Sequence, residues 1–166
     1  GLVQRAALRR LGLVSGWSRQ RETFCVALAD PGWLAGVGVK RGVDAREVVQ
    51  YIRSAGRKAV PLPVDIRTEA ACGKLVEQAV AGLGGLDILV NNAARQQSHD
   101  SILDISTEQF DWTLRTNLYA LFWITRAAIP HMPPGSAIVN TTSVNAYDPS
   151  ANLLDYAMTK AAIANF

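Results

Sequence analysis

From residue 44 to residue 166, apolar positions follow two alternating patterns. In some segments apolar residues recur every three or four positions, which predicts helices, and short apolar runs between them predict buried strands. The expected helices cover residues 44–56, 68–82, 106–131 and 156–166, and the expected strands cover residues 59–64, 86–90 and 136–142. Strands that alternate with helices favour right-handed βαβ units, so we expect an α/β fold with a parallel sheet.

Polar residues stand where several of these helices should begin. Asp44 and Thr68 occupy N-cap positions, and Ser106 followed by Gln109 has the form of a capping box. Gly56 is placed to end the first helix. Local hydrogen bonding therefore supports the same helix limits as the hydrophobic pattern.

Residues 1–42 lack such a pattern. They hold seven of the thirteen glycines and seven Lys and Arg residues against two acidic ones, whereas the remaining residues hold ten basic and twelve acidic ones. The net charge of +3 thus comes from the first quarter of the chain and does not indicate a nucleic-acid groove in the folded body. We expect a single domain over residues 1–166, irregular or divergent over 1–42 and regularly patterned over 43–166.

Length and composition exclude several classes of protein. A chain of 166 residues with 49% hydrophobic and 19% charged residues suits one soluble domain and not a disordered chain. No apolar run approaches the roughly 18–20 residues of a membrane-spanning helix. Cys25 and Cys72 provide neither a disulfide framework nor a metal cluster, so we expect a cytoplasmic protein without a metal or a membrane partner.

Polar side chains follow each of the predicted strands. Asp65 ends the first, Asn91 and Asn92 end the second, and Ser143 ends the third. The carboxyl ends of parallel strands open on one crevice, and a polar group leaving a buried strand needs a partner, so we expect these residues to face one cleft. The alternative is that each residue caps the helix or turn that follows it.

Tyr156 and Lys160 are the most informative pair. Residues four positions apart lie on the same face of a helix. An ammonium group near a phenol favours the phenolate form, which makes the phenol a better proton donor or acceptor near neutral pH. Ser143 stands thirteen residues before Tyr156 at a strand end, and Asn117 lies within the preceding long helix.

Taken together, the motifs resemble the short-chain dehydrogenase/reductase family over about residues 44–166. They are Asp65, the run Asn91-Asn92-Ala93-Ala94, Asn117, Ser143, Tyr156 and Lys160. The usual family run ends in Gly, so Ala94 is a small departure. The resemblance implies a Rossmann-like, doubly wound parallel sheet with helices on both faces. It also implies an oxidoreductase that moves a hydride between NAD or NADP and a carbonyl or secondary alcohol.

The resemblance assigns roles to four catalytic positions. Tyr156 would be the general acid/base, and Lys160 would bond the nicotinamide ribose and favour the phenolate. Ser143 would hydrogen-bond the substrate oxygen, and Asn117 would hold a water that links Lys160 to solvent. The implied cofactor contacts are Asp65, Ile66, Asn91, Asn92, Ala93, Tyr156 and Lys160.

The resemblance fails at the Gly-rich turn that should follow the first strand and approach the pyrophosphate. Residues 32–38 read GxxxGxG, but the five residues before Asp44 cannot hold the helix and strand that must come next. Residues 13–16, Leu-Val-Ser-Gly, stand at the right distance before Asp65, and Trp-Ser-Arg-Gln then replaces the expected glycines. Residues 17–42 therefore reflect either a shifted reading frame or true divergence with another phosphate cradle.

Two functions remain open at this stage. The first is an NAD(P)-dependent oxidoreductase with a small carbonyl or alcohol substrate. The second is a truncated or non-catalytic remnant that binds the cofactor weakly or not at all, since the resemblance also implies a missing C-terminal part and a sheet incomplete at both ends. Family members commonly pair through the helices that carry Asn117 and Tyr156, so we expect the intact form to be a homodimer or homotetramer.

Overall fold

The computed structural model of the chain describes residues 13–14, 25–26, 49–50, 53–54, 59–62 and 64–166. Its sheet has the strand order β2-β1-β3-β4, and all pairs are parallel. The strands are β1 (Leu13–Val14), β2 (Cys25–Val26), β3 (Ile88–Asn91) and β4 (Ala137–Asn140). The parallel α/β sheet of a Rossmann-like fold is therefore confirmed.

The strand order creates a switch point between β1 and β3. The chain passes from β1 to β2 on one side and then returns to form β3 on the other side, with Val14 opposite Val90. In parallel sheets a ligand crevice forms at such a point, outside the carboxyl ends of the strands. β3 and β4 pair from Ile88 opposite Ala137 to Asn91 opposite Asn140, so their polar ends lie side by side.

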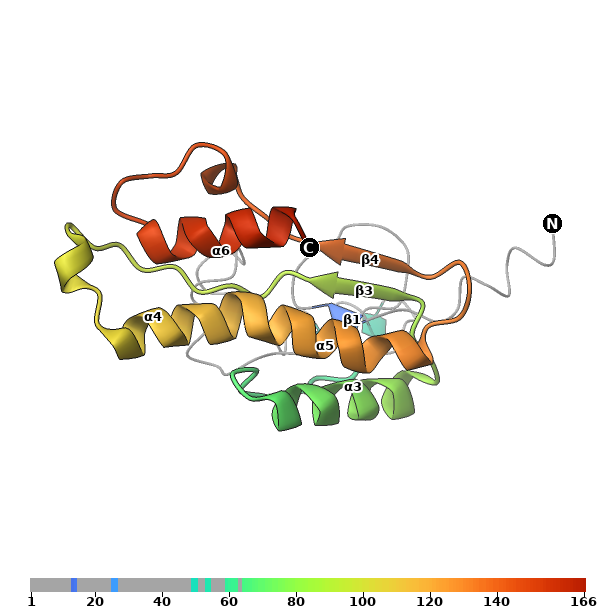
Figure 1. Cartoon of the computed structure of the whole chain (residues 1–166). Coiled ribbons are helices and arrows are strands. Elements are labelled where there is room, and N and C mark those ends of the chain that lie inside the picture. Colours follow the sequence, from blue (N-terminus) through green and yellow to red (C-terminus); the bar gives the residue numbers. More distant parts are fainter. Residues whose placement is uncertain (1–12, 15–24, 27–48, 51–52, 55–58, 63) are drawn as a thin grey trace.

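Four α-helices with described bounds accompany this sheet, besides the helical residues 49–50 and 53–54. They are α3 (Glu69–Leu83), α4 (Thr107–Leu114), α5 (Ala120–Ala128) and α6 (Leu154–Ala164). Figure 1 shows α3 packed along α5, and the arrows of β3 and β4 directed toward α6. The core lies between these elements and is built by Leu75, Val76, Leu86, Leu89 and Ile124. The ends of the strands therefore meet the helix that carries Tyr156 and Lys160.

The limits of α3 follow from its end residues, and Thr68 is its N-cap as predicted. The Thr68 hydroxyl accepts a hydrogen bond from the backbone N–H of Ala71 (3.3 Å) at the N-terminus. Gly84 ends the helix with a φ of 90°, and its N–H donates to the Val80 carbonyl (2.8 Å). Gly84 is required here because other residues adopt this left-handed conformation at a cost.

The long helix predicted over residues 106–131 is present but interrupted. A π-helical turn, Arg115–Tyr119, separates α4 from α5, and a short 3-10 turn, Ile129–His131, ends the run. Asn117 lies inside the π-turn. Such turns are frequent at functional sites because they redirect side chains that a regular helix would space evenly.

The predicted capping box at Ser106 is only half formed. Ser106 Oγ accepts from the backbone N–H of Gln109 (3.2 Å), but the Gln109 side chain contacts other groups that are described below. A complete capping box instead joins Ser101 and Asp104 at a 3-10 turn, Ile102–Asp104.

The strand predicted over residues 59–64 is not formed as a ladder. Residues 59–62 have no regular structure, and Val64 makes a single bridge. Pro61 and Pro63 explain the difference, because proline has no N–H to donate to a neighbouring strand. The segment still packs inward, since Ala59 is buried and Val60 lies against Gly82 of α3.

Other expectations fall largely outside the described residues. The helix predicted over residues 44–56 is described only at residues 49–50 and 53–54, which are helical. Of residues 1–42, the structure describes only β1 and β2, and β1 agrees with a first strand at Leu13–Val14. Among the described helices, none has the length and apolar character needed to cross a membrane.

Candidate active site

Asn91 joins three elements at the end of β3. Its Nδ2 donates to Asn140 Oδ1 at the end of β4 (3.0 Å) and to Thr125 Oγ1 on α5 (3.0 Å). The side chain is buried, so both hydrogen bonds are needed to satisfy its amide group. Asn91 thereby fixes the strand ends at which the candidate site is built.

Lys160 is buried beside these strand ends, with only 2% of its surface exposed. Its Nζ donates to the backbone carbonyl of Thr141 (2.7 Å), just beyond β4. The same nitrogen lies 5.6 Å from the centroid of the Tyr156 ring. Burial lowers the pKa of Lys160 to about 8, because removing water disfavours the ammonium form.

A second hydrogen bond fixes Lys160 from the backbone side. Thr142 Oγ1 donates to the Lys160 carbonyl (2.7 Å), so consecutive residues after β4 contact both ends of this lysine. The placement of Lys160 and Tyr156 on one face of α6 is confirmed by the 5.6 Å distance between Lys160 Nζ and the Tyr156 ring.

Ser143 follows Thr142 directly and begins a 3-10 turn, Val144–Ala146. Its Oγ accepts from the backbone N–H of Asn145 (3.2 Å), a bond that does not use the hydroxyl proton. Ser143 thus acts as a local cap, as the alternative interpretation proposed. The same hydroxyl retains a proton that it can donate to a ligand.

Asn117 is almost completely buried and holds the turn that follows β3. Its Oδ1 accepts from the backbone N–H of Arg95 (2.6 Å), and its Nδ2 donates to the carbonyl of Arg95 (2.9 Å). Nδ2 also donates to Thr159 Oγ1 on α6 (3.0 Å). Asn117 therefore connects the π-turn, the segment after β3 and the helix of Tyr156.

The remaining positions expected to contact the cofactor are Asp65, Ile66, Asn92 and Ala93. The carboxylate of exposed Asp65 accepts from the Arg67 backbone N–H (3.0 Å), from Nε (2.8 Å) and from Nη2 (2.5 Å). The hydrogen bonds from the Arg67 side chain are the main reason that the pKa of Asp65 lies below its ordinary value. Ile66 is part of the core, and its carbonyl accepts from Cys72 Sγ (3.2 Å). Asn92 and Ala93 are half-buried at the end of β3.

Sequence reasoning missed a group of polar residues that connect α4, α6 and the segment after β3 next to Tyr156. They are Arg95, Gln109, Thr113, Asp155 and Thr159. One signal was available for two of them, since Asp155 directly precedes Tyr156 and Thr159 directly precedes Lys160. Arg95, Gln109 and Thr113 belong to other elements, and only the tertiary fold brings them here.

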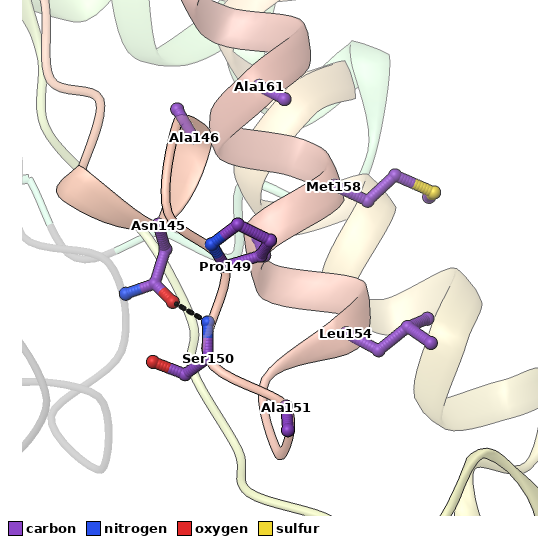
Figure 2. Close-up of a pocket in the computed structure, with 9 residues that line it drawn as sticks. Asn145, Ala146, Pro149, Ser150, Ala151, Leu154, Met158 and Ala161 are labelled. Carbon is purple, nitrogen blue, oxygen red and sulfur yellow. Dashed lines mark hydrogen bonds between the residues drawn. The ribbon is translucent and has the colours of Figure 1, made fainter.

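A pocket of about 380 Å³ lies beside the turn that follows Ser143. Figure 2 shows Asn145, Pro149 and Ser150 on the loop side and Leu154 and Met158 on the α6 side. Its lining is mainly apolar, with the Asn145 and Ser150 side chains as polar groups. Ser150 donates its backbone N–H to Asn145 Oδ1 (2.8 Å), which stabilises the loop wall.

Comparison with known proteins gives one consistent result. The family model for short chain dehydrogenase matches residues 22–166. The uncharacterized oxidoreductase YhxD of Bacillus subtilis is 47% identical over 123 residues, which are 74% of this chain and 41% of the relative. NADPH-dependent aldehyde reductase 1, chloroplastic, of Arabidopsis thaliana is 39% identical over 127 residues, or 44% of its length.

A solved structure shows the same likeness in three dimensions. The short chain dehydrogenase of Burkholderia cenocepacia in complex with NADP superposes with a TM-score of 0.75 at 30% identity, over 86% of this chain and 54% of the other. The aligned part of this chain spans less than half the length of the two curated relatives. A family model that matches residues 22–166, together with the strand-end site described above, shows that this chain belongs to the short-chain dehydrogenase family.

Proposed function

We propose that this chain carries the catalytic centre of an NAD(P)-dependent oxidoreductase that interconverts a carbonyl compound and a secondary alcohol. The observation that carries this proposal is the buried ammonium of Lys160, 5.6 Å from the Tyr156 ring at the carboxyl end of β4. A buried ammonium near a phenol stabilises the phenolate, so the phenol can exchange a proton with a substrate oxygen.

In the proposed mechanism four residues act on the proton and on the substrate oxygen. Tyr156 donates a proton to the substrate oxygen in reduction and accepts it in oxidation. Ser143 donates its hydroxyl proton in a hydrogen bond to the same oxygen and orients it. Lys160 stabilises the phenolate, and Asn117 holds the water through which Lys160 exchanges protons with solvent. Both Nδ2 hydrogens of Asn117 are bonded to protein atoms, so an oxygen of this residue would hold that water.

The donor set at the strand ends fits a nicotinamide cofactor. Lys160 uses one N–H for the Thr141 carbonyl and retains two for ribose hydroxyls. The Asp65 carboxylate and the end of β3 at Asn91, Asn92 and Ala93 would hold the adenosine part, and the backbone of Ile66 would border it. When bound, the nicotinamide supplies or accepts the hydride. The Arabidopsis relative is named as NADPH-dependent and the Burkholderia structure contains NADP, which supports NADP as the first cofactor to test.

The first experiment is a titration of the purified chain with NADPH and with NADH, followed by nicotinamide fluorescence. We expect saturable binding of at least one of them. With a ketone as substrate, Tyr156→Phe should lower the turnover number at least a hundredfold, because general acid–base catalysis contributes about 10²–10⁴-fold. NADPH affinity should persist in this variant, and full turnover by Tyr156→Phe would remove Tyr156 from its role.

The second candidate is a remnant that keeps the fold and binds the cofactor weakly or not at all. The observation that favours it is the sequence Trp-Ser-Arg-Gln at residues 17–20, where the family has glycines that approach the pyrophosphate. The same titration separates the two candidates, since saturable binding in the micromolar range contradicts a remnant.

We also propose that copies of the intact protein associate through the long helices. Large apolar side chains are exposed on the π-turn, α5 and α6, namely Tyr119, Phe122, Leu154 and Met158. Exposed apolar groups on neighbouring helices are typical of interfaces between subunits.

A further inference from the structure

A buried carboxylate lies immediately before Tyr156. Asp155 and Thr113 are both completely buried, on α6 and α4 respectively. Asp155 Oδ2 accepts from Thr113 Oγ1 (2.6 Å) and from Gln109 Nε2 (3.4 Å). These contacts join two helices that are remote in sequence, at a position next to the proposed acid/base.

Arg95 supplies the opposite charge. Its Nη1 donates to Thr113 Oγ1 (3.1 Å) and its Nη2 donates to Gln109 Oε1 (2.6 Å), so the guanidinium reaches Asp155 through these two side chains. Burial lowers the pKa of Arg95, and the charge of Asp155 acts in the opposite direction. A buried carboxylate is costly without such compensation, so the four residues form one unit.

The unit contacts the backbone of Tyr156 directly. Asp155 Oδ1 accepts from the Tyr156 N–H (2.8 Å). The Tyr156 carbonyl accepts a hydrogen bond from Thr159 Oγ1 (2.7 Å). Thr159 Oγ1 in turn accepts from Asn117 Nδ2, and Asn117 Oδ1 accepts from the backbone N–H of Arg95. Two chains of hydrogen bonds therefore run from Arg95 to the two backbone groups of Tyr156.

A simpler role for Asp155 is stabilisation of the start of α6. The N-cap residue Leu153 makes no side-chain cap, and an acidic residue in the first turn is favourable there. That role needs only one carboxylate oxygen and no burial. The second oxygen, bound to α4, is explained only if the position of α6 relative to α4 and to the segment after β3 matters.

We propose that Asp155, held by Thr113 and Gln109 and neutralised by Arg95, is a positioning residue that fixes Tyr156 relative to Lys160 and to the segment at residues 91–95. The inference rests on the proposed function only in making Tyr156 the acid/base. It adds Arg95, Gln109, Thr113 and Asp155 to the residues on which the rate depends, although none of them touches the substrate.

The test uses the full chain labelled with 3-fluorotyrosine. Each of the four tyrosines gives a ¹⁹F resonance, and that of Tyr156 is assigned by its absence in Tyr156→Phe. Thr113→Val keeps the shape of the side chain and removes its hydroxyl, so we expect the Tyr156 resonance to shift by more than its linewidth. Thr113→Ser keeps the hydroxyl and should restore the wild-type position. Arg115→Gln is the matched control, because half-buried Arg115 pairs with Asp111 one turn earlier on the helix (2.6 Å).

Turnover gives the second readout. With NADPH and a ketone, Thr113→Val should lower kcat about tenfold to a hundredfold, as expected for a misplaced catalytic group, while the KM for NADPH stays unchanged. A variant that merely loses thermal stability would not lower kcat while leaving the KM for NADPH unchanged. If Thr113→Val does not fold, Arg95→Gln tests the same unit with the same expected shift of the Tyr156 resonance. Arg95 is only half-buried, whereas Thr113 is buried.

The outcomes separate the two proposals. An unmoved Tyr156 resonance in folded Thr113→Val, or in Arg95→Gln where that variant replaces it, overturns the positioning role, whatever the activity. Absence of cofactor binding and turnover in the wild type overturns the proposed function, and the ¹⁹F comparison still decides whether the unit positions Tyr156.

Discussion

At the scale of single residues, the function proposed for Lys160 opposes the stability of the fold. An ammonium group with 2% of its surface exposed, whose pKa burial lowers to about 8, is destabilising in the folded protein. The hydrogen bond to the Thr141 carbonyl offsets only part of this cost. A buried lysine whose pKa is strongly lowered is typical of catalytic sites.

The buried lysine predicts a specific dependence of stability on pH. Below pH 8 both folded and unfolded chains bind the Lys160 proton, and between pH 8 and the unfolded pKa of about 10.4 only the unfolded chain retains it. Stability therefore rises with pH in this window, by up to about 3 kcal/mol for this group. Urea unfolding should show the wild type gaining stability relative to Lys160→Met between pH 7 and pH 10.

The matched control for this measurement is Lys74→Met, which removes an exposed ammonium from α3. A constant difference between wild type and Lys160→Met over the whole range would show that burial does not act on the proton of Lys160 in this way.

At the scale of elements, two glycines of α3 predict opposite effects of the same substitution. Gly73 lies inside the helix, and a Cβ there would meet no atom within 4 Å, so Gly73→Ala should stabilise the protein by about 1 kcal/mol. Gly84 has a φ of 90°, so Gly84→Ala should destabilise it by about 1–2 kcal/mol. Thermal or urea unfolding measures both, and equal signs would contradict the account of how α3 ends.

Elements also show what could be predicted from the sequence. The helical spacing of Tyr156 and Lys160 and the polar end of the strand at Asn91 depend on short-range patterns, and α6 and β3 carry these residues as expected. The strand expected over residues 136–142 is shorter, since β4 ends at Asn140, and Ser143 caps the 3-10 turn that follows. The ladder expected over residues 59–64 failed because the apolar run was weighed above its prolines. An apolar run thus does not predict a strand when prolines within it lack the N–H groups that strand pairing needs.

Long-range contacts were beyond such reasoning. Nothing local distinguishes a regular helix through Asn117 from the π-turn that is formed there. Gln109 matched the capping-box pattern, but its side chain turns to Arg95 and Thr113 because the fold brings those groups within reach. The unit of Arg95, Gln109, Thr113 and Asp155 is therefore a property of the tertiary structure, and sequence reasoning did not identify it, although Asp155 directly precedes Tyr156.

At the scale of the whole molecule, the proposed association of copies can be tested on one helix face. Leu154 and Met158 are 41% and 43% exposed and project from the same side of α6 (Figure 2). Analytical ultracentrifugation should show a dimer or tetramer for the wild type. Met158→Glu should shift it to the monomer, because burying an unpaired carboxylate in a subunit interface costs several kcal/mol.

The control for association is Ile129→Glu, which places the same charge on another exposed apolar residue, in the 3-10 turn that ends the long helix. If exposed apolar surface in general drove association, both substitutions would dissociate the assembly. If α6 forms the interface, only Met158→Glu does so. The distinction matters for the proposed catalysis, because α6 also carries Asp155, Tyr156 and Lys160. An interface on the outer side of α6 would hold these three residues against α4 and the segment after β4, whereas in a monomeric wild type the buried polar unit alone would do so.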